Sequence, residues 1–156
     1  MKRFPWMPPL ALLAMSVQGA DVDPPHVHQP DGRGDLRVAV QFPAALREHT
    51  LENMRGHLLT LQRIQDALAR NAFDDAAQLA ETRLGLSSLE AHGAHEVAKY
   101  MPQGMQDIGA EMHKAASRFA LEAADAGATG DNRKALAALA AITSQCVSCH
   151  ASYKLE

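Results

Sequence analysis

The chain contains only two cysteines, and they stand three residues apart near its end. Cys146 and Cys149 are the only thiols among 156 residues, so a framework of several disulfides is excluded. A structural zinc site built from two cysteine pairs is excluded as well, because there is no third cysteine to begin a second pair. The two thiols therefore belong to one short motif.

Aromatic residues are also scarce, and there is no excess of positive charge. Phe, Trp and Tyr make up 4% of the chain, and 15 basic residues face 18 acidic ones, for a formal net charge of −3. Since no basic stripe stands out, nucleic acid is not expected as a partner. The sequence shows no convincing nucleophile or acid–base pair, so it does not indicate an enzyme.

Alanine and leucine are abundant, with Glu, Gln, Arg and Lys between them. These residues are strong helix formers, and this composition is typical of a nearly all-helical protein. A length of 156 residues suits one domain with its own core. We therefore expect an all-α fold.

The cysteines form the motif Cys146-Val147-Ser148-Cys149-His150, which is the attachment sequence of a c-type haem. On a helix, residues i and i+3 lie one turn apart on the same face, so two thiols can add to the two vinyl groups of one porphyrin. His150 follows directly and can present its imidazole to the iron as proximal ligand. Thioredoxin-like redox sites share the Cys-x-x-Cys spacing but need a βαβ context, which is absent here. The motif predicts one covalent haem c per chain.

Residues 1–20 have the pattern of a secretory signal peptide. Residues 1–3 carry positive charge, residues 10–15 form a short apolar run, and residues 16–20 supply small side chains for cleavage. The apolar run is too short to span a bilayer, so we expect no stable membrane insertion after cleavage; a retained anchor is the alternative. Haem is attached to such motifs outside the cytoplasm, and export to the periplasm agrees with this requirement.

Residues 21–42 are rich in Pro, Gly, Asp and His and show no helical period. We expect a flexible N-terminal lead-in here, followed by a folded domain over residues 43–156. His26 and His28 lie in this lead-in and could bind a metal, although two histidines in a loose tail usually have no structural role.

Helical periodicity divides the domain into four helices. The first is expected from about Ala44 to Ala69. After a turn around Asn71, the second begins with Asp74 as N-cap and extends to about Leu86. Their short connection makes the two helices antiparallel neighbours. The positions expected on or near the buried face of the first helix are Leu46, Leu51, Met54, Leu58, Leu61, Gln65 and Leu68.

Between Gly85 and Met101 the periodicity weakens, which indicates a crossover or a short irregular helix. Pro102 starts the third helix, Gly127–Gly130 end it, and Asp131 caps the fourth, which carries the haem motif on the apolar face of its last turns. The inner positions expected on this helix are Leu136, Leu139, Ile142, Cys146, Cys149 and Tyr153. Four helices joined by two short turns and one crossover predict an antiparallel four-helix bundle.

With an export signal, four helices and a Cys-x-x-Cys-His motif close to the C-terminus, the chain resembles the cytochrome c′ family. Tyr153 and Lys154 match the aromatic and basic residues that commonly follow the His of that family. The resemblance covers residues 44–154. Homodimers that form through the first two helices are common in that family, so the resemblance implies a possible homodimer. The acidic charge would suit a redox partner protein with a basic docking patch.

The family divides by what occupies the sixth position of the iron. In cytochromes c′ proper, an apolar side chain of the first helix shields that position and small gases can bind; in low-spin relatives a Met of this helix binds the iron, which favours electron transfer. Met54 is the only Met of the first helix here. Counting back from the turn at Asn71 places the family's distal position within one residue of Met54. Aligning Arg47 with an early helical Arg of the family instead places Leu51 there, with Met54 one turn deeper. His57, one turn beyond Met54, would give bis-His ligation.

We therefore expect a periplasmic cytochrome that acts in one-electron transfer, with Met54 as distal ligand. The first alternative is a five-coordinate protein that binds NO or CO at an open site lined by Leu51, Met54 and Leu58. The second is a copper-binding protein, because thioethers and imidazoles together are ligands for Cu(I). The side chains that suggest copper are His92, His95, Met101, Met105, Met112 and His113, although Met105 and Met112 also fit a buried helical face.

Overall fold

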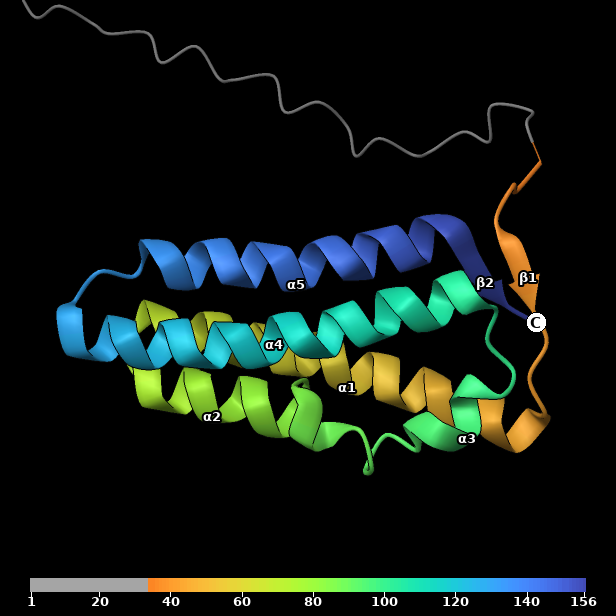
Figure 1. Ribbon diagram of the computed structural model, residues 1–156, viewed down its shortest axis with the longest axis horizontal. Coiled ribbons are helices and arrows are strands. Elements are labelled where there is room, and N and C mark those ends of the chain that lie inside the picture. Colours follow the sequence, from red (N-terminus) through yellow and green to blue (C-terminus); the bar gives the residue numbers. More distant parts are fainter. Residues whose placement is uncertain (1–33) are drawn as a thin grey trace, which may run out of the picture. The chain divides into compact units, whose positions relative to one another are not determined.

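The computed structural model describes residues 34–156. The predicted signal peptide and residues 21–33 of the predicted lead-in lie outside the described residues. The described chain is mostly helical, which confirms the all-α prediction. Its elements in order are β1 (Val38–Val40), α1 (Ala44–Ala69), α2 (Phe73–Arg83), the 3₁₀ turn η1 (Leu86–Ser88), α3 (Ala94–Ala98), α4 (Gln103–Thr129), α5 (Arg133–Ser152) and β2 (Tyr153–Leu155) (Figure 1).

Helix α1 has the bounds that its apolar period predicted. It begins directly after Pro43, a residue that is well tolerated at a helix start because it has no backbone N–H to satisfy. After the helix, Asn71 takes a left-handed φ of 57°, a conformation that Asn tolerates better than most residues. The short segment from Arg70 to Ala72 thereby reverses the chain into α2.

Helix α2 starts earlier than predicted, and Asp74 is not its N-cap. Phe73 is its first residue, and no side chain caps the helix. Asp74 and Asp75 instead lie in the first turn, where their charges interact favourably with the positive end of the helix dipole. The prediction of Asp74 as N-cap is therefore wrong, because Asp74 lies in the first turn and acts there as a charge.

The irregular stretch predicted between the second and third helices contains η1 and the short helix α3. Helix α2 ends at Arg83, before the predicted Leu86, because the backbone at Gly85 turns back close to the last turn of the helix. A Cβ at Gly85 would lie 2.7 Å from the backbone oxygen of Glu81, so a side chain does not fit there. Gly93 then takes a φ of 62° at the start of α3, a backbone conformation that glycine adopts without strain.

The connection between α4 and α5 is short and well defined. Helix α4 starts directly after Pro102 and ends at Gly130, which has a φ of 74°. Asp131 Oδ1 accepts a hydrogen bond from the backbone N–H of Arg133 at 3.1 Å. Asp131 thus satisfies one of the free N–H groups at the start of α5, but the N-cap residue is Asn132 and not the predicted Asp131.

The four long helices run alongside one another, but their packing is uneven (Figure 1). Helix α4 packs against α2 and α5, and α1 packs against α2, whereas α1 and α5 meet only sparsely. One apolar core connects all four helices. Its larger buried side chains are Leu61, Ile64, Leu68, Leu84, Met112, Phe119, Leu139 and Ile142. Many of the remaining core positions are alanines, which let the helix backbones approach closely.

A parallel pair of short strands joins the two ends of the described chain. Val38 of β1 pairs with Tyr153 of β2, and Val40 pairs with Leu155. This pair was not predicted from the sequence. A second apolar cluster lies beside it, with Val40, Phe42, Val97 and Met105 buried and Leu46, Met101, Cys149, Tyr153 and Leu155 packed against them. The strand pair and this cluster connect the segment before α1 to the segment after α5. The latter segment follows the Cys-x-x-Cys-His motif directly.

Three positions expected on buried faces are exposed. Leu58 is 70% exposed and Leu136 is 48% exposed, and Gln65 also lies on the surface. In α1 the buried face passes through Leu61, and the position four residues earlier is His57. The half-buried His57 therefore takes the place on this face that was expected for Leu58.

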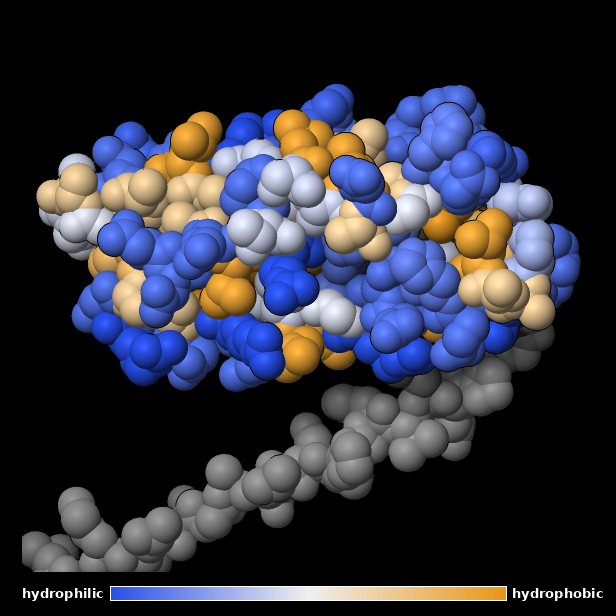
Figure 2. Space-filling view, turned by 90° about the horizontal axis from the view of Figure 1, so that it is seen from below, coloured by the Kyte–Doolittle hydropathy of each residue, from blue (hydrophilic) through white to orange (hydrophobic). Residues whose placement is uncertain are grey.

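Apolar side chains also remain on the surface, in separate patches among charged ones (Figure 2). Among the described residues, α5 is long and apolar enough to cross a membrane when judged by length and composition alone. In the structure it packs against α4 and buries Ala135, Leu139 and Ile142 in the core.

Candidate haem site

The two cysteines lie one turn apart near the end of α5. Both side chains are half-buried, and they are not joined in a disulfide. Cys146 packs beside the main core and its Sγ donates to the Ile142 carbonyl at 3.5 Å, whereas Cys149 packs against the second cluster. Burial raises the pKa of both thiols above their ordinary value, so both are neutral near pH 7. The helix thus presents two un-ionised thiols on one partly enclosed face.

A hollow of about 250 Å³ lies between α1 and the end of α5. It brings Leu51 and Met54 of α1 into the same space as Cys149 and His150 of α5, and Met105 of α4 adds a further apolar wall. The hollow lies between two long helices that pack only sparsely against each other. Sparse packing between α1 and α5 thus accompanies the hollow at this place.

Basic side chains also line this hollow: Arg37, Arg47 and Lys154. Asp35 pairs with Arg37 at 2.8 Å, and Lys154 lies 3.8 Å from Asp35 and 3.1 Å from Glu156. Hydrogen bonds from Arg37 hold the pKa of the Asp35 carboxyl well below its usual range. Within residues 34–156, Arg47 has no carboxylate within ion-pair distance. A ligand that carries carboxylates would find a matching cation here.

The hollow contains most, but not all, of the side chains predicted for haem binding. Met54, Cys149 and His150 line it, and Cys146 lies one turn earlier on α5, outside the lining. The side chain of His150 is exposed at this end of α5. Leu58, which was predicted to line an open distal site, is instead exposed to solvent.

His57 does not line the hollow, and its ring lies among other histidines. Its ring centroid is 4.7 Å from that of His92 and 6.3 Å from that of His113, and His92 and His113 are 5.6 Å apart. Burial, together with these two neighbours, lowers the pKa of His57 to about 4. This grouping was not predicted from the sequence. The available signal was the position of His57 four residues before Leu61, on the inward face of α1.

The side chains predicted as an alternative copper site do not gather in one place. His92 and His113 are neighbours, but His95 is exposed on α3. The methionines of the set are apolar packing residues in or beside the two clusters: Met101, Met105 and Met112. In the part of the chain that the structure describes, no three His, Cys, Asp or Glu side chains form a ready-made metal site.

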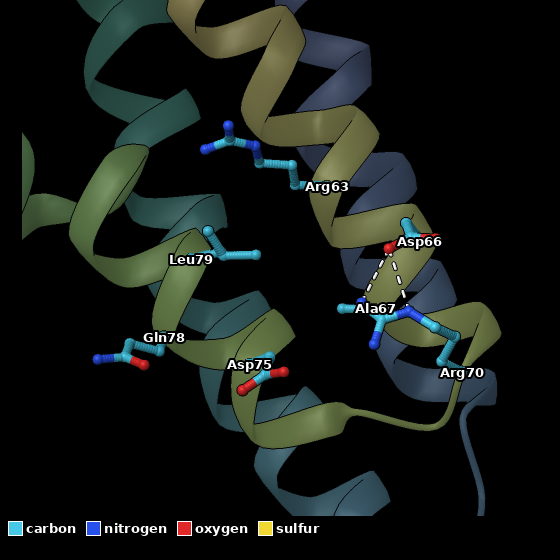
Figure 3. A pocket seen from close by; sticks show the side chains of 7 residues that line it. All are labelled: Arg63, Asp66, Ala67, Arg70, Asp75, Gln78 and Leu79. Atoms are coloured by element: carbon cyan, nitrogen blue, oxygen red, sulfur yellow. Dashed lines mark hydrogen bonds and ion pairs between the residues drawn. The ribbon is translucent and has the colours of Figure 1, made fainter.

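A second hollow, of about 380 Å³, lies between α1 and α2 near their connecting turn (Figure 3). Asp66 and Arg70 form an ion pair of 2.8 Å at its edge, and both side chains are largely exposed. An ion pair open to water contributes little to stability. The other side chains around it are Arg63, Ala67, Asp75, Gln78 and Leu79. None of the predicted site residues lines this hollow.

The chain matches no protein-family model, and no curated protein or solved structure is significantly similar to it. Its function is therefore inferred from its own residues and their arrangement.

Proposed function

We propose that this chain is a c-type cytochrome of the cytochrome c′ type, with one haem c attached through Cys146 and Cys149 and with His150 as proximal ligand. The observation that carries the proposal is the hollow between α1 and α5, where Met54 and Leu51 meet Cys149 and His150. When bound, a c-type haem supplies one-electron chemistry at its iron. The chain's own residues supply the attachment points, the axial nitrogen and the apolar walls.

In this proposal α1, α2, α4 and α5 form an antiparallel four-helix bundle. Short connections join α1 to α2 and α4 to α5, which favours antiparallel neighbours, and the α2–α4 crossover contains η1 and α3. The uneven packing supports a cofactor between α1 and α5, because bundle proteins build such sites from side chains on facing helices.

Each group around the hollow has a role that follows from its chemistry. The helical turn between Cys146 and Cys149 sets the spacing of the two sulfurs, and His150 comes next in the chain on the same helix. Leu51, Met54 and the other apolar walls exclude water from the enclosed side. Arg47 is available to pair with the carboxylates of the propionate groups that every haem carries.

One-electron transfer is the activity that we propose, with the Met54 thioether as distal ligand. A thioether stabilises the ferrous state and leaves no position for exogenous gases. The alternative is a five-coordinate protein that binds NO or CO, and the observation that favours it is Leu51, which lines the same hollow and could shield an open position. His57 is the less suitable ligand, because its ring lies against His92 and His113 instead of lining the hollow.

The two activities can be separated by the spectrum of the haem-loaded chain. With Met54 as ligand, the oxidised wild type should be low-spin with a Met–iron charge-transfer band, and Met54→Ala should lose that band. Leu58→Ala is the matched control, because Leu58 lies one turn further along α1 and is exposed, and its spectrum should equal that of the wild type. A high-spin wild type that binds CO rapidly when reduced would overturn electron transfer in favour of gas binding.

We also propose export to the periplasm, with a redox protein as partner. The signal pattern in residues 1–20 and the maturation requirement of the motif support export. Exposed Leu58 and Leu59 on α1 are compatible with a homodimer through this helix. Sedimentation of the haem-loaded chain tests the dimer: Leu58→Glu should convert a dimer to a monomer, and a monomeric wild type would contradict it.

A further inference from the structure

Outside the proposed haem site, three histidines from three different parts of the chain come together. His57 belongs to α1, His113 to α4, and His92 to the segment between η1 and α3. Their ring centroids are 4.7, 5.6 and 6.3 Å apart. Three imidazoles this close, half-buried to buried, are not explained by apolar packing or by the proposed haem.

Hydrogen bonds define which nitrogen of His113 is free. Its Nδ1 lies 2.7 Å from the backbone oxygen of Leu84, which can only accept, so Nδ1 carries the proton and donates. The Nε2 atom of His113 is then left with a lone pair. Metal-binding histidines commonly donate their second ring N–H to a carbonyl in this way, which fixes the ring and its tautomer.

His92 is arranged in the same manner, with a weaker bond. The Ser88 hydroxyl donates to the Gly85 carbonyl at 2.7 Å, so its oxygen is free to accept from His92 Nδ1 at 3.4 Å. This arrangement again leaves Nε2 with a lone pair. The backbone of His92 is held from α1, because His49 Nε2 lies 3.0 Å from its carbonyl oxygen and the Asn53 amide donates to the same oxygen at 3.1 Å.

His57 supplies the third nitrogen. Its Nε2 is buried and, within residues 34–156, has no hydrogen-bond partner. A buried polar atom without a partner costs free energy, so its retention here calls for a ligand or another compensating interaction. Among residues 34–156, therefore, no other group uses the Nε2 atom of any of the three rings.

The separations suit a single metal ion. With metal–nitrogen bonds of about 2.0 Å at tetrahedral angles, two ligating imidazoles have ring centroids about 5 Å apart. The observed distances of 4.7, 5.6 and 6.3 Å lie around this value. The donor atoms are not yet arranged around a common point, so binding requires the rings to turn about their side-chain bonds.

We propose that His57, His92 and His113 bind one copper or zinc ion through their Nε2 atoms. Imidazole ligands suit both metals, and three protein nitrogens leave a fourth position for water or another ligand. This site does not depend on the haem motif. It also differs from the copper site considered from the sequence, because it excludes His95 and the methionines and includes His57.

Titration of the full-length chain tests the proposal, with Zn²⁺, Cu²⁺ and Cu⁺ as separate probes. One ion per chain should bind with at least one of them, and H57Q, H92Q and H113Q should each weaken binding by about tenfold or more. Two variants serve as controls and should bind as the wild type does. H95Q removes an exposed histidine three residues from His92, and H26Q/H28Q removes the two histidines of the N-terminal segment.

No bound ion with any probe would overturn the proposal. Equal losses in H92Q and H95Q would overturn it as well. X-ray absorption of the metal-loaded wild type gives a second readout that does not depend on how the variants fold. It should show about three imidazole nitrogens at about 2.0 Å, and a sulfur in the coordination shell would contradict the site.

Discussion

The hydroxyl of Tyr153 lies directly against Gly104 in the first turn of α4. A Cβ at Gly104 would be 2.6 Å from the hydroxyl oxygen and 3.9 Å from the ring carbon that bears it. The Cβ of an alanine at position 104 would clash with the Tyr153 hydroxyl, so one of the two residues would have to move. Tyr153 lines the proposed haem site and pairs with Val38, so this contact helps to hold the chain just after His150.

Gly104→Ala should therefore destabilise the wild-type protein by about 1 kcal/mol through crowding, even though alanine is the better helix former. In a Tyr153→Phe background the hydroxyl is gone and the remaining carbon contact is ordinary, so the same substitution should be neutral or stabilising. Urea denaturation of the four proteins measures the coupling in a double-mutant cycle. Additive effects of the two substitutions would contradict the contact.

The core should depend strongly on Phe119, which is fully buried in α4 between the other long helices. Phe119→Ala should lower the free energy of unfolding by about 3–5 kcal/mol, because it leaves a large cavity. Leu121→Ala is a matched control on the same helix, since Leu121 is 73% exposed, and it should change stability by less than about 0.5 kcal/mol. Thermal or denaturant unfolding measures both; similar losses in the two variants would be inconsistent with the described packing.

The metal-free chain should lose stability as the pH falls from about 6.5 to about 4. The pKa of His57 in the folded chain is about 4 against an ordinary value of 6.5, because burial and the neighbouring His92 and His113 disfavour its charged form. The unfolded chain binds more protons than the folded chain in this pH window, so a lower pH favours unfolding. His57 alone can lower the free energy of unfolding by at most about 3 kcal/mol. Burial, together with His113, His49 and Arg83, also lowers the pKa of His92, which acts in the same direction.

Denaturant unfolding at a series of pH values in the presence of a chelator checks this expectation. His57→Gln removes the titrating group and should flatten the dependence between about pH 6.5 and 4. His95→Gln serves as control, because His95 is exposed on α3, and it should leave the slope unchanged. A slope that persists fully in His57→Gln would show that other groups cause it.

The helices were predictable because their signals are local. The bounds of α1 follow from its apolar period and from the turn at Asn71, and the end of α4 follows from Gly130. Asp74 was assigned to the wrong role because an acidic residue favours both the N-cap and the first turn of a helix. Leu58 was misplaced because a single residue of offset turns a side chain by about 100° around the helix.

The strand pair and the histidine cluster could not be predicted in the same way. β1 and β2 are each three residues long, too short for a recognisable alternation, and they pair because the helices bring residues 38–40 and 153–155 together. His57, His92 and His113 meet because the segment after η1 returns to α1, and no period in the sequence determines that path. The Cys-x-x-Cys-His motif could be identified from the sequence because it depends only on the spacing of neighbouring residues.

The most direct test of the account is the mass of the mature chain made together with the haem-maturation machinery. Wild type should carry the added mass of one covalent haem, and the haem should remain attached in acidified organic solvent. Cys146→Ser/Cys149→Ser should carry none, whereas Leu58→Ala, altered at an exposed position outside the hollow, should be as fully loaded as the wild type. A correctly exported wild-type chain without covalent haem would contradict the proposal that this chain is a c-type cytochrome.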